Sequence, residues 1–454
     1  MKVHLIAIGG SAMHNMALSL FEKGYMVTGS DDEINEPSKG RLLKAGLLPE
    51  TLGWYPEKIN KSIDAVILGM HAREDNPELI KAKELGLKIY SYPEFIYEAT
   101  KDKTRVVIGG SHGKTTITAM ILHALSKNNI DTDFMVGAQL EGFNTMVRLT
   151  KEAKVAVIEG DEYLASPIDR RPKFHLYHPN IAVLSGIAWD HINVFPTFEM
   201  YIEQFKIFID LIEEGGSLVY CAEDKELKKV AATSGIKNKV QKIVYSVPKH
   251  KISNGVTFLL EKGNEIALEI FGDHNLMNLN AARLVCNEIG LDDKEFYNAI
   301  KSFKGAAKRL ELVFKNENFA FYKDFAHSPS KLKATTAAVK QQFADRYVVA
   351  CMELHTFSSL TEQFLNEYKG AMDNADEAIV YYNPHTIAHK KLKPISEDQV
   401  LKAFDRKDLK VFTDSNKLTE YLKSNNWKQK VLLMMSSGNF DGIDFNKLAS
   451  SFSS

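Results

Sequence analysis

The sequence is poor in cysteine and has no excess of charge of either sign. Its 454 residues include three cysteines, which lie far apart at positions 221, 286 and 351. They form neither a disulfide framework nor a closely spaced metal-binding pair, so we expect a reducing compartment, the cytoplasm. Lys and Arg total 57 against 58 for Asp and Glu, a formal net charge of −1. This balance gives no electrostatic signal for a nucleic-acid partner or an acidic membrane.

Long hydrophobic runs are also missing. No apolar run is long enough to span a bilayer, and the opening apolar stretch reaches Gly9 before the core of a signal sequence could form. We therefore expect no membrane insertion. Low-complexity tracts are absent apart from a short serine-rich tail at 450–454, so disordered and collagen-like classes are excluded. What remains is a multidomain globular protein.

What the sequence does have is a regular alternation of short β-rich runs with helical stretches. Runs at 3–8, 105–110 and 347–351 are examples from three parts of the chain. This alternation predicts an α/β protein with parallel sheets throughout. The length favours three domains, which we place at 1–101, 102–312 and 313–454. The first has the glycine turn and the acid after the second strand that are typical of a Rossmann-like domain.

A phosphate-binding loop is the strongest single motif. The segment from Gly110 to Thr116, Gly-Ser-His-Gly-Lys-Thr-Thr, lies between a β-rich run and a helical stretch. In that setting backbone amides and a helix N-terminus bind phosphate oxygens, Lys114 meets the terminal phosphates and the Thr115 hydroxyl reaches Mg²⁺. Ile108 stands where the usual pattern has its first glycine. The alternative, an ordinary glycine-rich turn with a solvated lysine, is disfavoured by Gly-Lys-Thr-Thr in this setting.

Acidic residues follow the next predicted strand. Glu159, Asp161 and Glu162 come directly after 155–158 and offer oxygen ligands for a metal on nucleotide phosphates. A solvated acidic loop is the alternative. His191 follows another strand and is a second ligand candidate, although a lone histidine is more often structural.

Two further motifs suit a nucleotide. Asn278 lies one turn after Asn275 at a predicted helix start, where amide groups suit a purine edge and helix capping is the simpler account. Arg309 offers a fixed cation for a transferring phosphate, with a solvated basic turn as the alternative.

Together these motifs resemble the Mur ligases of bacterial cell-wall synthesis, along almost the whole chain. The family's shortened phosphate loop, glutamate, Asp-His pair, His-Asn-x-x-Asn, Gly-x-x-[Arg/Lys]-Arg and Asp-[Tyr/Phe]-[Gly/Ala]-His motifs match 110–115, Glu159, 190–191, 274–278, 305–309 and 324–327. The departures from the family pattern are Gly186 for asparagine, Asn193 for an acid, Ser328 for a second histidine, and His14-Asn15 around the third N-terminal glycine.

The resemblance implies a fold and a reaction. The fold is a three-domain α/β protein: an N-terminal Rossmann-like domain, a central phosphate-loop mononucleotide-binding domain and a C-terminal Rossmann-like domain. The implied enzyme transfers the ATP γ-phosphoryl group to a carboxylate, and an amine then attacks the acyl phosphate. ATP and Mg²⁺ are the implied cofactors. The implied catalytic residues are Lys114, His191 and Arg309; the ATP site is Gly110, Ser111, His112, Gly113, Lys114, Thr115, Thr116, Asn278, Arg309 and Asp324; the metal ligands are Thr115, Glu159 and His191.

The N-terminal motifs resemble the branch that binds UDP-N-acetylmuramate, which implies a UDP-sugar site at Gly9, Gly10, Ser11, Met13, Ser30 and Asp31. Residues 162–179 are similar to the members that add the recycled tripeptide L-Ala-γ-D-Glu-meso-diaminopimelate in peptidoglycan recycling. Arg170 and Arg171 lie in that segment and suit the peptide's carboxylates. We therefore expect the tripeptide as acceptor, with biosynthetic L-alanine addition as the alternative.

Two rival classes stay open on the residues alone. A nucleotide-gated switch would use the phosphate loop for binding and slow hydrolysis, but it leaves the two other Rossmann-like parts unexplained. A dehydrogenase or redox-sensing protein would use the N-terminal turn, but that turn lacks the full G-x-G-x-x-G pattern.

Overall fold

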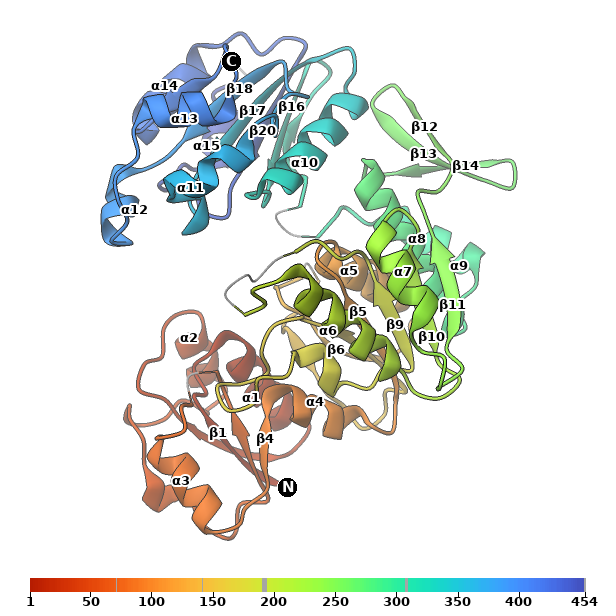
Figure 1. Cartoon of the computed structure of the whole chain (residues 1–454), viewed down its shortest axis with the longest axis vertical. Coiled ribbons are helices and arrows are strands. Elements are labelled where there is room, and N and C mark those ends of the chain that lie inside the picture. Colours follow the sequence, from red (N-terminus) through yellow and green to blue (C-terminus); the bar gives the residue numbers. More distant parts are fainter. Residues whose placement is uncertain (71, 141, 190–193, 307–308, 453–454) are drawn as a thin grey trace. The chain divides into compact units, whose positions relative to one another are not determined.

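The computed structural model describes residues 1–454 except 71, 141, 190–193, 307–308 and 453–454 (Figure 1). The chain divides into two compact units, which we describe in turn. One comprises residues 1–247 with 277–300, and the other residues 248–276 with 301–454. Among the described residues, no helix combines the length and the apolar character that crossing a membrane would require.

The first unit begins with a four-stranded, wholly parallel sheet in the order β2-β1-β3-β4. Its central strands are buried apart from Lys2 and are apolar except for Lys2 and His4 of β1, as expected of parallel strands covered on both faces. The elements are β1 (Lys2–Ile6), α1 (Ser11–Glu22), β2 (Met26–Ser30), α2 (Ser38–Lys44), β3 (Ala65–Leu68), α3 (Pro77–Glu84), β4 (Ile89–Ser91) and α4 (Tyr92–Thr100).

A seven-stranded sheet follows in the same unit, in the order β11-β10-β9-β5-β8-β6-β7. All pairs are parallel except β6 with the edge strand β7. The elements are β5 (Thr104–Gly109), α5 (Lys114–Lys127), β6 (Thr132–Met135), β7 (Val147–Arg148), β8 (Val155–Glu159), β9 (Ile181–Leu184), α6 (Phe198–Asp210), β10 (Ser217–Cys221), α7 (Lys225–Thr233), β11 (Gln241–Tyr245) and α9 (Asp293–Ile300). Because β5 lies between β8 and β9, the loops after these three strands meet at one sheet edge, where α/β proteins bind ligands.

The second unit has two sheets. A small antiparallel sheet contains β12 (His250–Ser253), β13 (Val256–Glu261) and β14 (Asn264–Leu268). The helix α8 (Asp273–Glu288) begins in this unit and from Met277 onwards belongs to the first unit. The larger sheet has the order β15-β16-β20-β17-β18-β19 and is parallel except for β15 with β16. Its elements are β15 (Glu311–Lys315), β16 (Phe319–Asp324), α10 (Pro329–Gln342), β17 (Tyr347–Glu353), α11 (Glu362–Leu365), β18 (Glu377–Tyr381), α12 (Pro384–His389), α13 (Glu397–Phe404), β19 (Lys410–Phe412), α14 (Ser415–Ser424), β20 (Lys430–Met435) and α15 (Phe445–Ser450).

The α/β fold class is confirmed, but the expectation of parallel sheets throughout is wrong at three places. β7 and β15 pair antiparallel at sheet edges, and β12–β14 form an antiparallel meander. The meander had a sequence signal, because Asn254-Gly255 joins β12 to β13 with both residues at positive φ (53° and 67°), the dipeptide typical of a tight hairpin. The domain boundaries at 101/102 and 312/313 stay predictions.

Candidate functional site

The phosphate-loop motif forms the connection between β5 and α5. Gly110 and Gly113 have φ of +113° and +80°, a conformation that side chains other than glycine rarely adopt. A Cβ atom on Gly113 would lie 2.4 Å from Oδ1 of Asn278. The structure therefore brings the predicted adenine-reading amide of α8 against the loop, in contact with a position that only glycine can occupy.

Lys114 is the first residue of α5, and its ammonium group is held at the loop. Its Nζ donates to the carbonyl of Gly110 at 2.9 Å and to Oε2 of Glu162 at 2.8 Å. Burial lowers the pKa of Lys114, but the carboxylates of Glu162 and Asp161 outweigh it and raise the pKa overall. Lys114 is thus a permanent cation placed where a phosphate group would bind.

Glu162 is itself held by a second group that the sequence analysis missed. The hydroxyl of Tyr201, on α6, donates to Oε1 of Glu162 at 3.3 Å and lies 3.2 Å from Oγ of Ser111. Ser111 in turn accepts from the amide of Ala188 at 2.8 Å. In sequence, Tyr201 looks like one more apolar-face residue of its helix, so no pattern distinguished it.

The predicted metal residues lie beside Lys114. Thr115 donates its hydroxyl to Oε1 of Glu159 at 2.7 Å, and the amide of Gly137 donates to Oε2 at 2.9 Å. Burial, and then the nearby Asp161, raise the pKa of Glu159. A carboxylate that is costly to bury and paired with a loop hydroxyl fits Mg²⁺ bound together with phosphate oxygens.

The second proposed metal ligand, His191, lies outside the described residues. Within the described part of the chain, no group of three or more His, Cys, Asp or Glu side chains gathers as a metal site would. Among the described residues, Thr115 and Glu159 are placed to contribute to such a site, and the role of His191 stays a prediction. The roles of His112, which is exposed, and Thr116, which is buried on α5, stay predictions.

The N-terminal glycine turn lies between β1 and α1. The amide of Gly9 donates to Oδ2 of Asp31 at 2.7 Å, and a Cβ atom on Gly9 would lie 2.9 Å from the same oxygen. Ser30, Asp31 and Met13 are buried, whereas Ser11 is exposed at the start of α1. Asp31 thus stabilises the turn through the amide of Gly9. Contact of these residues with a UDP sugar stays a prediction.

The predicted acceptor-binding arginines lie in the loop between β8 and β9. Arg171 donates through Nη2 to Asp169 at 2.6 Å and to Glu94 at 3.2 Å, so its guanidinium is already paired with carboxylates. Arg170 is exposed. Lys173 lies 4.2 Å from the ring centroid of Tyr163 and pairs with Asp161 at 3.3 Å. The role of this loop in acceptor binding stays a prediction.

In the second unit, Asp324 ends β16 and accepts two backbone amides, from Leu310 at 2.7 Å and from Ala326 at 2.7 Å. Burial raises the pKa of Asp324 and lowers that of His274. The guanidinium of Arg309 lies 4.9 Å from the ring centroid of Phe325. His274, Arg309 and Asp324 therefore lie near one another in this unit, and the ATP-binding roles of Arg309 and Asp324 stay predictions.

Comparison with known families gives three consecutive matches. They are the Mur ligase family, catalytic domain, at residues 2–104; the Mur ligase middle domain at 108–286; and the Mur ligase, glutamate ligase domain, at 308–438.

Individual relatives agree with this. The chain is 31% identical over 386 residues to the UDP-N-acetylmuramate--L-alanine ligase of Sulfurihydrogenibium sp. (strain YO3AOP1), covering 84% of this chain and 82% of the relative. Among solved structures, UDP-N-acetylmuramate-alanine ligase from Thermotoga maritima aligns with a TM-score of 0.68 at 20% identity, over 100% of this chain and 98% of that one. A murein peptide ligase from Psychrobacter arcticus aligns with a TM-score of 0.62 at 22% identity, also over 100% and 98%. At these identities the two structures indicate the fold alone.

Proposed function

The chain belongs to the Mur ligase family, and on that premise we propose that it joins the carboxylate of UDP-N-acetylmuramate to an amine at the expense of ATP. Members of this family are ATP-dependent ligases that form C–N bonds. The observation that carries the proposal is the cluster of Lys114, Thr115 and Glu159 at one turn, with Asn278 against the same loop.

Each of these side chains has a task in phosphoryl transfer. A carboxylate repels an approaching amine, so it is first converted into an acyl phosphate, from which phosphate leaves when the amine attacks. Lys114 exchanges Glu162 for a phosphate oxygen and neutralises the charge that moves during transfer. Thr115 and Glu159 would hold Mg²⁺, which supplies charge neutralisation on the phosphates when bound.

For the acceptor, the comparisons favour L-alanine over the tripeptide expected from the sequence. The curated relatives, including the one at 31% identity, carry the name UDP-N-acetylmuramate--L-alanine ligase. L-alanine is therefore the first candidate. It needs only a small site for one amine, one methyl group and one carboxylate.

The tripeptide remains a second candidate because of one specific segment, the loop between β8 and β9. Its sequence resembles the tripeptide-adding members, and Arg170 is exposed there. Arg171 is a weaker candidate for the peptide carboxylates than the sequence suggested, because Asp169 and Glu94 already occupy its guanidinium.

The test is a competition between amines. The protein is incubated with ATP, UDP-N-acetylmuramate and either L-alanine or the tripeptide. The amide product is identified by mass spectrometry, and kcat/KM is measured for each amine. A ratio of at least about 100 in favour of L-alanine, about 2.7 kcal/mol of discrimination, establishes the first candidate. The reverse ratio establishes the second, and in that case Arg170→Ala lowers use of the tripeptide while Lys127→Ala, an exposed cation on α5, does not. ATP hydrolysis without any amide product would overturn both.

A further inference from the structure

Helix α1 lies against the exposed edge of the central sheet. β7 is the last strand of that sheet, and an edge strand presents unpaired backbone groups that proteins usually cover. Two side chains of α1 cover backbone amides at the two flanks of β7. Oδ1 of Asn15 accepts from the amide of Met146 at 3.0 Å, and Oγ of Ser19 accepts from the amide of Leu149 at 2.8 Å. Asn15 and Ser19 are four residues apart, so they share one face of the helix.

Arg41, on α2, extends the same contact. Its Nη1 donates to Oδ1 of Asn15 at 3.0 Å, and its Nη2 donates to the backbone carbonyl of Asn144. The adjacent ring of His14 lies with Nε2 3.3 Å from Nη1 of Arg41. Burial, and the charge of Arg41, lower the pKa of His14 despite its bond to Gly10, so the neutral ring can accept there. One arginine thus joins the first sheet's helices to the segment before β7.

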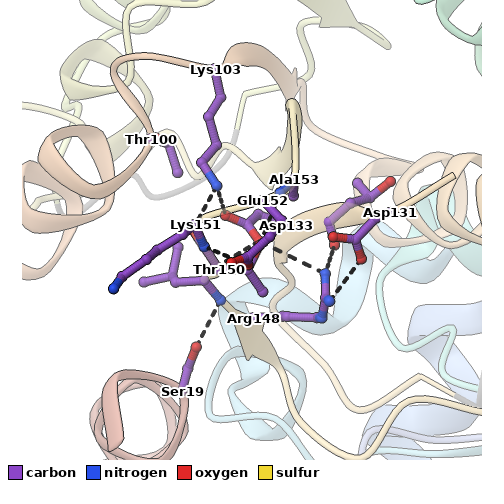
Figure 2. A network of polar contacts seen from close by, with 12 residues as sticks. Ser19, Thr100, Lys103, Asp131, Asp133, Arg148, Thr150, Lys151, Glu152 and Ala153 are labelled. Atoms are coloured by element: carbon purple, nitrogen blue, oxygen red, sulfur yellow. Dashed lines mark hydrogen bonds and ion pairs between the residues drawn. The ribbon is translucent and has the colours of Figure 1, made fainter. Parts of the chain in front are cut away.

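The segment that connects the four-stranded sheet to the seven-stranded sheet makes hydrogen bonds at the same edge (Figure 2). Lys103, which lies between α4 and β5, donates to the buried carboxylate of Asp133 at 2.5 Å and to the carbonyl of Thr150 at 2.8 Å. The amide of Thr150 also donates to Asp133 at 2.9 Å, and Arg148 pairs with Asp131 at 2.7 Å. The first sheet is therefore held to the central sheet by both its helices and its connection.

We propose that Asn15, Ser19 and Arg41 form a clasp that orients the N-terminal glycine turn relative to the phosphate loop, and that they are positioning residues for ligation. The clasp is linked to the glycine turn through the start of α1, because Nδ2 of Asn15 donates to the carbonyl of Ser11 at 2.8 Å. The family pattern has a glycine within His14-Asn15, and a glycine has no side chain with which to make these contacts.

The clasp has a specific kinetic consequence. Holding two reacting groups in a fixed relative orientation raises the rate of the chemical step, and small misplacements far from the reaction are costly. Loosening the clasp should therefore lower kcat for ligation while leaving the phosphate loop, and hence ATP binding, intact. This kinetic part rests on the proposed function, whereas the contact of α1 with the strand edge does not.

The test compares Asn15→Ala, Arg41→Ala and Ser19→Ala with the matched control Lys39→Ala, an exposed cation on the same helix as Arg41. We expect Asn15→Ala and Arg41→Ala to lower kcat at least about tenfold with the Kd for ATP within about twofold of wild type. Hydrogen exchange of the Met146 amide should accelerate in Asn15→Ala, and that of the Leu149 amide in Ser19→Ala. Asn15→Asp retains the acceptor oxygen for Met146 and Arg41 but cannot donate to the carbonyl of Ser11, so it should restore slow exchange of the Met146 amide and recover only part of the rate.

The outcomes separate the clasp from the proposed function. Unchanged exchange at Met146 and Leu149 in all variants would overturn the clasp, whatever the kinetics. Accelerated exchange with kcat within twofold of wild type would overturn the positioning role. If the wild-type protein forms no amide with either amine but the exchange responds as expected, the proposed function fails and the contact stands. Ser19→Ala removes a single hydroxyl, so it keeps the exchange test available if the other variants do not fold.

Discussion

The molecule uses the same four residues, Ile-Gly-Gly-Ser, in two strand-to-helix turns, at 8–11 and at 108–111. In the first turn the helix begins at once, at Ser11, and Gly10 has an ordinary φ of −58°. In the second, Gly110 has φ of +113° and the helix begins only at Lys114, after a second left-handed glycine. The inserted residues make a loop out of what is otherwise a tight turn.

The two turns also differ in the sign of the charged side chain that hydrogen-bonds to their backbone. The first is held by the carboxylate of Asp31 on the amide of Gly9, and the second surrounds the ammonium of Lys114. A tetrapeptide with two glycines therefore sets only a close strand-to-helix approach. The residues that follow it, and the acid opposite, decide whether the turn can neutralise a phosphate group.

Loss of the Lys114 ammonium should have the largest effect of the substitutions that distinguish the two turns. Lys114→Ala should lower the rate of ligation by about 10²–10³ or more, because an electrostatic stabiliser of the transferring group is lost. The fold should persist, since the side chain contacts polar groups rather than the apolar core. Steady-state kinetics on the purified variant, with Lys127→Ala as control, provide the measurement. Ligation within about tenfold of wild type would show that the assigned role is wrong.

The titratable groups packed near the two turns, His175 and Asp31, should have opposite effects on stability as the pH falls. A Cβ atom on Gly109 would lie 3.2 Å from the ring of Phe174, which stacks on His175 at 4.8 Å between ring centroids. Burial lowers the pKa of His175 to about 4, whereas burial raises that of Asp31. Because the pKa of this histidine is about 6.5 in the unfolded chain and lower in the folded one, the unfolded chain takes up the proton first as the pH falls. The stability that the neutral ring maintains above pH 6.5 is therefore lost as the pH falls towards 4.

His175→Gln should remove about 2 kcal/mol of the stability loss between pH 7 and pH 5. Glutamine can still donate to the carbonyl of Gln204, which the ring nitrogen contacts at 2.8 Å. The measurement is hydrogen exchange of β8 and β9 amides at both pH values. His389→Gln, an exposed histidine in the second unit, should change nothing. An equal loss of protection in His175→Gln and wild type would contradict the assignment of a buried neutral ring.

Much of this architecture follows from local sequence, and the exceptions have physical causes. Apolar runs such as 181–184 predict buried strands because parallel strands hide both faces. The proximity of Lys114, Thr115 and Glu159 was predictable because the loop and the acid follow adjacent strands, β5 and β8, whereas their roles stay predictions. Tyr201 and the clasp residue Arg41 were not, because their partners are 39 and 103 residues away and neither lies in a patterned motif.

Glycine substitutions test the difference in backbone conformation between the two turns. Gly113→Ala forces a side chain into a left-handed position and against Asn278, so it should weaken ATP binding at least about tenfold, by 1.4 kcal/mol or more. Gly10→Ala meets only ordinary contacts at 3.7–3.8 Å and should leave ATP binding unchanged. Titration with a fluorescent ATP analogue measures both. Equal loss in the two variants would mean that the effect is a general one of unfolding.

The smallest expected effect concerns the acid that holds the cation. Before ATP can engage Lys114, the ammonium must leave Glu162, which lies 2.8 Å away and is almost fully buried. Glu162→Gln keeps the shape and the acceptor oxygen but removes the negative charge, so the loop becomes more positive and its cation less strongly retained. We expect the Kd for ATP to fall about three- to tenfold, the scale of one screened charge at short range. Tyr201→Phe removes a hydroxyl that donates to Glu162 but keeps the negative charge, so it should not lower the Kd for ATP. Glu203→Gln, an exposed acid on the same helix, should have no effect. Weaker ATP binding in Glu162→Gln would instead mean that the carboxylate orients Lys114 for the phosphates rather than competing with them.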